Sequence, residues 1–234
     1  MKKIGNMNEA AWLLGIVLCA LGVCLCTKAG FGLSMIAAPP YILHRKLIQL
    51  SPFFTQGVCE YLWQGILLIV MCLGIRRFRW QYLLTFGTGI LFGLTVDAWF
   101  WLLGGNGICA SPAGRILLFA LGEGITALSI AFFFRTKLPL AIYELIVTEV
   151  ADRYAFPTPK VKMANDVVML VTSVVLALVL HRDLTGIGVG TVIITAVNAT
   201  LIGLFGKLLD KCFTFEPRFP RLVRLLKPNG DTNT

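Results

Sequence analysis

The chain of 234 residues is 57% hydrophobic and only 14% charged, with a formal net charge of +9. A soluble domain carries roughly 25% charged residues, so this composition excludes an ordinary soluble globular protein. The positive charge does not indicate nucleic-acid binding, because the basic residues lie between and after long apolar runs, where membrane anchoring and orientation explain them. We therefore expect an integral membrane protein that binds no nucleic acid.

Six apolar runs are long enough to cross a bilayer, whose hydrocarbon core needs about 20 residues of helix. Backbone groups in lipid must bond internally, and these runs do not alternate between apolar and polar residues, so we expect helices rather than a closed barrel. The predicted spans are residues 10–27, 54–75, 80–103, 114–134, 163–181 and 186–210.

Two further stretches, residues 30–50 and 138–156, are too apolar for ordinary loops and too short for spans. Each offers about 12–16 mostly apolar residues, a length typical of re-entrant, interfacial or buried segments. Pro39, Pro40 and Pro139 start or break helices in them, because proline has no amide donor. We expect re-entrant or interfacial segments; the alternative is two additional full spans.

The two halves of the chain resemble each other in the order of their elements. ALGVCLCTKAGFGLSMIA in the first half aligns without gaps on ALSIAFFFRTKLPLAIYE in the second, which places Lys28 on Arg135. With one residue of slippage, Glu60 then falls on Asp166. The alternative is that any two groups of three apolar spans look alike.

Three spans per half is an odd number, so the second half is expected to be inserted upside down, as in many transporters. The predicted fold is an all-α integral membrane protein of two inverted three-span repeats, each with one short segment. The first repeat covers residues 1–107 and the second covers residues 108–212. A basic tail, residues 213–234, is expected to be partly disordered.

The basic residues predict cytoplasmic N- and C-termini under the positive-inside rule. Anionic lipid headgroups are the expected partners of the tail. The basic residues expected on the cytoplasmic side are Lys2, Lys3, Arg76, Arg77, Arg79, Arg135, Lys137, Arg153, Lys160, Lys162, Arg218, Arg221, Arg224 and Lys227.

Ionisable groups inside spans are costly, and they persist when they pair or line a pathway. Glu60 and Asp166 are the leading pair because they occupy equivalent repeat positions; the alternative is that both lie near the membrane edge. Glu123 is the most central acid, and its alternative role is a neutral structural hydrogen bond. Lys28 and Arg135 attract an anionic solute, balance a buried acid or neutralise helix C-termini. The candidate pathway residues are Glu60, Asp97, Glu123, Glu144, Asp166, Asn198, Lys28 and Arg135.

No enzymatic motif, metal-ligand spacing or cofactor-binding motif stands out, so we expect neither enzyme activity nor a bound metal or cofactor. Of the seven cysteines, five lie in predicted spans and do not form the pattern of a disulfide framework. There free cysteine acts as a small apolar residue.

The string ALGVCLCTKAGFGLSMIAAP resembles the start of the YczE/YitT-like bacterial membrane proteins. The likeness continues through Asp97, Lys162 followed by Asp166, and the Gly190–Thr191 pair. The chain departs from the pattern at Met35 and Ile36, where proline is usual, and at Glu60, where asparagine is common. The resemblance implies a six-span protein of the bacterial cytoplasmic (inner) membrane and supplies no substrate.

The sequence predicts a transporter or facilitator for a small polar or charged solute, with its site between the repeats and with proton or cation coupling. The alternative is a non-transporting scaffold or regulator that acts through a partner. A membrane-embedded enzyme acting on a lipid or thiol is a third, weaker hypothesis. The oligomeric state is left open, and a homodimer is one alternative. A dry bundle with every intramembrane acid paired would favour the scaffold.

Overall fold

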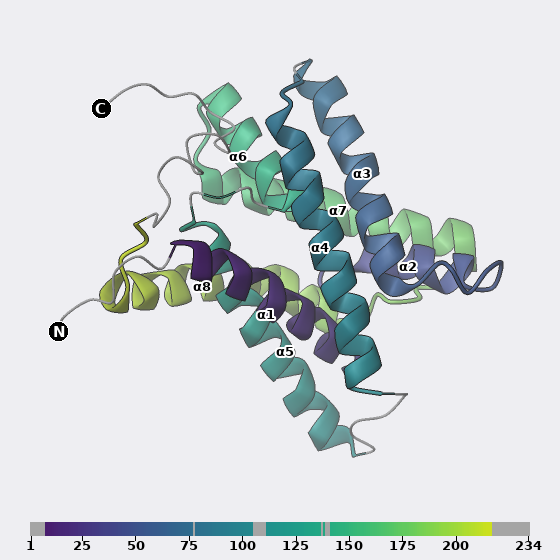
Figure 1. Cartoon of the computed structure of the whole chain (residues 1–234). Helices are drawn as coiled ribbons and strands as arrows, with labels where there is room; N and C mark the ends of the chain where they lie inside the picture. The colour runs from purple at the N-terminus through teal and green to yellow at the C-terminus, as the bar shows by residue number, and fades with distance from the viewer. Residues whose placement is uncertain (1–7, 77, 105–110, 137, 139–140, 217–234) are drawn as a thin grey trace.

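A computed structural model of the chain describes residues 8–76, 78–104, 111–136, 138 and 141–216. The regular elements of this part of the chain are eight α-helices (Figure 1). They are α1 (Asn8–Ala29), α2 (Ala38–Leu47), α3 (Gln56–Ile75), α4 (Gln81–Leu102), α5 (Pro112–Phe133), α6 (Ile142–Tyr154), α7 (Thr158–His181) and α8 (Val189–Cys212). Predictions for Lys2, Lys3, Arg77, Lys137, Pro139 and the basic tail from residue 217 onward concern positions outside the described residues.

Six of these helices are long and apolar enough to cross a membrane, which confirms the expected number of spans and indicates a multi-pass membrane protein. They are 20–24 residues long, with mean hydropathies of 1.5–2.4 in their most apolar windows. At 1.5 Å per residue they reach roughly 30–36 Å, which matches the thickness of the hydrocarbon core.

The last two long helices begin at different residues from those predicted. α7 begins at Thr158 rather than 163. Pro159 is tolerated in its first turn, because the amides of a first turn have no hydrogen-bond partner within the helix and the missing N–H of proline costs nothing there. α8 begins at Val189 rather than 186, because Gly186 has a φ of +79° and Gly188 is extended. Hydropathy alone does not detect such a turn inside an apolar run.

The two remaining helices are short, which excludes the alternative of eight full spans. α2 has 10 residues and α6 has 13. These lengths correspond to roughly 15 and 20 Å, well below the roughly 30 Å of the hydrocarbon core. Both short helices nevertheless bury their first residues: Ala38 and Ile142 are fully buried.

Helices α1 and α5 pack side by side through the middle of the molecule (Figure 1). α1 also packs on α4, and α5 packs on α8. α3 pairs with α4, while α7 contacts α8. The short helix α2 packs against α3 and α7, and the short helix α6 packs against α7, α3 and α4. In the view of Figure 1, α2 and α6 lie on opposite sides of the α3–α4 pair.

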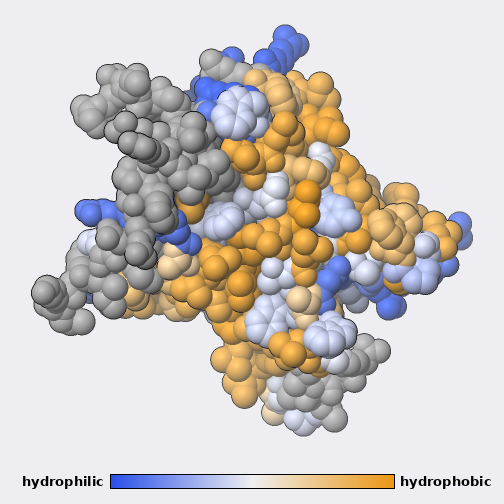
Figure 2. Space-filling view, viewed as in Figure 1, coloured by the Kyte–Doolittle hydropathy of each residue, from blue (hydrophilic) through white to orange (hydrophobic). Residues whose placement is uncertain are grey.

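The surface is apolar and the interior carries polar groups, as expected of a protein surrounded by lipid. Hydrophobic side chains cover much of the face over α1, α4 and α5, whereas hydrophilic residues gather toward the ends of the molecule (Figure 2). Each long helix exposes large apolar side chains. Examples are Leu14, Ile69, Leu94, Leu117, Val171 and Val192.

Glycine allows the closest helix contacts. At Gly22 of α1, an added Cβ would lie 2.7 Å from the carbonyl oxygen of Gly122 on α5. At Gly57 of α3, it would lie 2.1 Å from the carbonyl oxygen of Gly93 on α4. These neighbours are backbone atoms, so the helices cannot accommodate a side chain without separating.

Replacing Gly57 by alanine is expected to destabilise the protein by about 1–3 kcal/mol, the usual cost of overpacking. Gly87→Ala on the same α3–α4 pair is the matched control, because nothing lies within 4 Å of its added Cβ. SDS-titration unfolding of the purified variants in detergent measures the difference. Equal stability of the two variants would contradict the close α3–α4 contact.

Candidate functional site

A cavity of about 30 Å³ lies among the helices and is lined by residues from both halves of the chain. A water molecule needs roughly 10–15 Å³ of such space, so the cavity has room for about two waters. Most of its wall is apolar, and polar side chains from five helices interrupt it. The principal polar residues are Glu60, Thr88, Thr126, Tyr143, Glu144 and Asn198.

Both short helices begin at this cavity. Ala37, which precedes α2, and Ala141, which precedes α6, both line it. α2 starts from a turn in which the Ala37 and Ala38 amides donate to the carbonyl oxygen of Ser34, at 3.0 and 2.9 Å. The two predicted short segments therefore meet at one enclosed space through their N-terminal ends.

Glu60 lies in the first turns of α3 with 1% of its surface exposed. The Tyr143 hydroxyl of α6 donates to Glu60 Oε1 at 2.7 Å, and Gln64 Nε2 donates to the same oxygen at 3.4 Å. The other oxygen, Oε2, is buried without a hydrogen-bond partner. Glu60 is therefore shielded from solvent, and the alternative that it lies near the membrane edge stays a prediction.

Two further buried oxygens at the cavity lack partners. Glu144 is 3% exposed and Asn198 of α8 is 1% exposed. Glu144 Oε2 and Asn198 Oδ1 have no hydrogen-bond partner. Burial raises the pKa of the Glu144 carboxyl, and the positive charge of Lys162 opposes that rise. Buried polar atoms in native proteins are nearly always bonded, so three unpaired oxygens around one cavity indicate a site.

A charged cluster adjoins the cavity on α7. Lys162 donates to Asp166 one helical turn away, and only 6% and 5% of these two side chains are exposed. Lys162 also acts electrostatically on Glu123 of α5 and on Glu144. Lys162 is buried because α7 begins at Thr158, so it is not an exposed anchoring residue, and its expected position on the cytoplasmic side stays a prediction.

Buried acidic groups outnumber buried basic groups in this region. Glu60, Glu144, Glu123 and Asp166 are all at least nine-tenths buried. Lys162 is the lysine that acts on three of these acids. Glu123 Oε1 has no hydrogen-bond partner, and the alternative role of Glu123 as a neutral structural hydrogen-bonding group stays a prediction.

Asp97 and Lys28 lie away from the cavity and support helix ends. Asp97 accepts hydrogen bonds from Thr55 Oγ1 at 2.6 Å and from the Gly57 amide at 2.8 Å, at the N-terminus of α3. Lys28 donates to the carbonyl oxygen of Gly104, just after α4. A carboxylate at a helix N-terminus and an ammonium at a C-terminus both complement the helix dipole.

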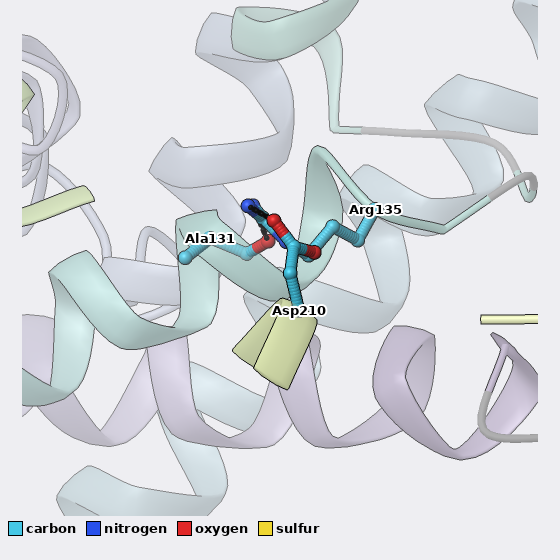
Figure 3. Close-up of polar contacts among 3 residues, drawn as sticks. All are labelled: Ala131, Arg135 and Asp210. Atoms are coloured by element: carbon cyan, nitrogen blue, oxygen red, sulfur yellow. Dashed lines mark hydrogen bonds and ion pairs between the residues drawn. The ribbon is translucent and has the colours of Figure 1, made fainter. Parts of the chain in front are cut away.

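Arg135 also lies away from the cavity. Its guanidinium forms a two-pronged ion pair with Asp210 of α8, at 2.6 Å for both contacts, and donates to the Ala131 carbonyl oxygen at 3.2 Å (Figure 3). This ion pair joins the end of α5 to the last turns of α8. Lys28 and Arg135, which the sequence alignment of the two halves matches, therefore each connect two helices, through different partners.

Two wider cavities, of about 350 and 320 Å³, border Thr27 and Tyr41. The first is lined largely by residues 30–33 and 186–189, and the second includes Asp97. Leu33 lines the first of these cavities and the adjacent Ser34 lines the central one. The Leu33 amide donates to the Gly186 carbonyl oxygen at 3.0 Å, which ties the two halves together.

The central site includes residues that sequence reasoning did not select. Tyr143 and Gln64 bond to Glu60, and Lys162 pairs with Asp166. The four-residue spacing of Lys162 and Asp166 on a helix was the available signal. No local signal connects Tyr143 to Glu60, because they are 83 residues apart.

Fold and site together define a multi-pass α-helical membrane protein with a largely apolar cavity that both halves of the chain line and that buried polar side chains interrupt. The chain belongs to a family described as "Family of unknown function (DUF6198)", whose pattern matches residues 7–207. It is similar to the "Uncharacterized protein YyaS" of Bacillus subtilis (strain 168), with 24% identity over 208 residues, covering 88% of this chain and 95% of that protein. No solved structure matches the chain. Neither description names the YczE/YitT-like proteins, so that specific resemblance stays a prediction.

Proposed function

We propose that the protein is a membrane carrier for a small polar or charged solute, which binds in the central cavity. The observation that carries the proposal is the meeting of both short helices at one enclosed space lined by unpaired buried oxygens. A scaffold has no need for such oxygens, because each unsatisfied buried group costs roughly 1–3 kcal/mol. A passing solute satisfies them temporarily.

The pattern of helix contacts supports two repeats around this cavity, and three spans in each repeat would make them inverted. Exchanging α1 with α5, α2 with α6, α3 with α7 and α4 with α8 converts the contact of α1 with α4 into that of α5 with α8. It likewise converts α2 with α3 into α6 with α7, and α2 with α7 into α6 with α3. The contact of α6 with α4 departs from this exchange. In inverted-repeat transporters, broken helices meet at a midplane site in this manner.

The enclosed cavity favours a carrier over an open channel. At about 30 Å³, the space does not form a continuous pore, whereas one wider cavity, lined by Leu33, lies next to Ser34 on one side. In the proposed cycle, the contact between residues 33 and 186 opens on one side while the Arg135–Asp210 ion pair holds the other. Proton or cation coupling would use the buried carboxyl groups.

The proposed location is the bacterial cytoplasmic membrane, with both termini in the cytoplasm. Arg79, Arg135, Arg153 and Lys160 then lie at the cytoplasmic ends of the helices, as the positive-inside rule requires. In this proposed orientation α2, which lies between the first two spans, is on the outer side, and α6, which lies between the fourth and fifth spans, is on the cytoplasmic side. Binding of anionic lipid by the basic tail and assembly into a homodimer remain predictions.

Flux into proteoliposomes tests this function. The purified chain is expected to catalyse uptake of at least one solute from a panel of labelled amines, amino acids, sugars and inorganic ions. Glu60→Gln is expected to reduce that uptake at least tenfold, because it replaces an unpaired carboxylate oxygen with an amide group. Glu216→Gln is the matched control, because Glu216 is exposed and lies beyond α8.

The scaffold hypothesis makes the opposite forecast. Vesicles containing correctly folded protein would then take up no member of the panel faster than protein-free vesicles. If wild type and Glu60→Gln take up solute equally, the solute does not pass through the cavity at Glu60.

A further inference from the structure

We infer that the central cavity recognises a primary ammonium group, so that the transported solute belongs to the class of small primary amines. This inference rests on the proposed function for its role in transport. The ligand chemistry itself follows from three oxygens, the two short helices and the apolar walls around them.

Three buried acceptors without partners surround the cavity. They are Glu60 Oε2 from α3, Glu144 Oε2 from α6 and Asn198 Oδ1 from α8. A primary ammonium group carries three donors and no acceptor, so it complements three acceptors from three directions. Two of the three are carboxylate oxygens, which supply the negative charge that a buried cation requires.

The same surroundings disfavour an anion. The N-terminus of a helix binds anions through free amides, but Pro39 and Pro40 at the start of α2 have none. The Ala37 and Ala38 amides already bond to Ser34. At the start of α6, Glu144 in the first turn neutralises the positive end of the helix.

Lys162 does not reverse this selectivity, because its ammonium group is paired with Asp166. Acids in the region outnumber it, since Glu60, Glu123 and Glu144 are buried as well. The described residues contain no group of three or more His, Cys, Asp or Glu side chains placed to hold a metal ion. A directional N–H donor therefore fits the site better than a multivalent metal.

The remaining wall accommodates a short aliphatic substituent. Ile130, Phe92 and Phe133 line the cavity beside the polar groups. Aromatic faces attract ammonium cations, and aliphatic side chains favour a hydrocarbon stem. A volume of about 30 Å³ favours the smallest alkylamines in this closed form.

Calorimetric titration of the purified full chain in detergent tests the inference. Methylammonium and ethylammonium are expected to bind saturably. Tetramethylammonium, which keeps the charge and lacks N–H donors, is expected to bind at least tenfold more weakly, as are ethanol and sodium. Glu144→Gln is expected to weaken ethylammonium binding at least tenfold, whereas Glu216→Gln leaves it unchanged.

A second variant separates recognition from folding. Asn198→Asp keeps the shape of the side chain and adds a third negative charge, so it is expected to tighten ethylammonium binding several-fold. Equal binding of tetramethylammonium, binding of sodium alone, or no binding of any amine would overturn the inference.

Binding and flux distinguish the two proposals. If the protein transports another solute and binds no amine, the ammonium inference fails while the carrier function stands. If ethylammonium binds with the expected selectivity but no solute crosses the membrane, the carrier function fails and the recognition site stands.

Discussion

Replacing Lys162 by methionine is expected to lower the free energy of unfolding by about 3–5 kcal/mol, the usual loss when one partner of a buried ion pair is removed. Lys162 and Asp166 are both buried, so the substitution leaves the Asp166 carboxylate without its counter-ion. It also removes the positive charge that acts on Glu123 and Glu144. SDS titration in detergent, followed by tryptophan fluorescence, measures the loss.

Two variants control this experiment. Lys160→Met removes an exposed lysine two residues away and is expected to change stability by less than about 0.5 kcal/mol. The double variant Lys162→Met/Asp166→Asn removes both charges of the pair and is expected to recover most of the stability. Equal, small losses for the two lysine variants would contradict the buried pair.

Amine binding is expected to weaken as the pH falls, starting at a higher pH than an ordinary glutamate would produce. Burial raises the pKa of Glu144, so its carboxyl takes up a proton before exposed acids do. The protonated carboxyl has lost the negative charge that the ammonium group requires. Because one proton competes with one ligand, the dissociation constant rises about tenfold per pH unit below that pKa.

The groups that interact electrostatically with Glu144 come from several helices, so the control isolates Glu144 itself. Lys162 and Asp166 of α7 act on Glu144, and Glu144 in turn acts on Cys19 of α1, Glu60 of α3 and Tyr143 of α6. Titrations of ethylammonium between pH 5 and 9, roughly the range in which such a carboxyl changes charge, are expected to show a flatter profile for Glu144→Gln. An unchanged profile in that variant would assign the pH dependence to another group.

The long helices were predictable because hydropathy reports span length directly. Their ends were less predictable: residues 186–188 are as apolar as a span, but Gly186 adopts a positive φ that breaks the helix. The short helices were also predictable as short, since charged residues such as Arg45 and Arg153 limit their apolar length.

The site was only partly predictable, because it depends on contacts between segments far apart in sequence. Glu60, Glu144 and Asn198 were selected as ionisable or amide groups in apolar surroundings, and all three line one cavity. The same rule selected Asp97 and Arg135, which bond elsewhere. Helix packing decides which buried acids find a hydrogen-bond partner. The bond from the Tyr143 hydroxyl to Glu60 is an example, because it joins two different helices.

Counterflow in proteoliposomes tests the central claim most directly, because a carrier returns its site to the starting side faster when solute occupies it. Vesicles preloaded with unlabelled ethylammonium are expected to accumulate labelled ethylammonium several-fold faster than empty vesicles, and Glu60→Gln is expected to abolish the acceleration. Equal uptake by preloaded, empty and protein-free vesicles, for ethylammonium and for every other solute of the panel, would contradict a carrier with its site between the two halves.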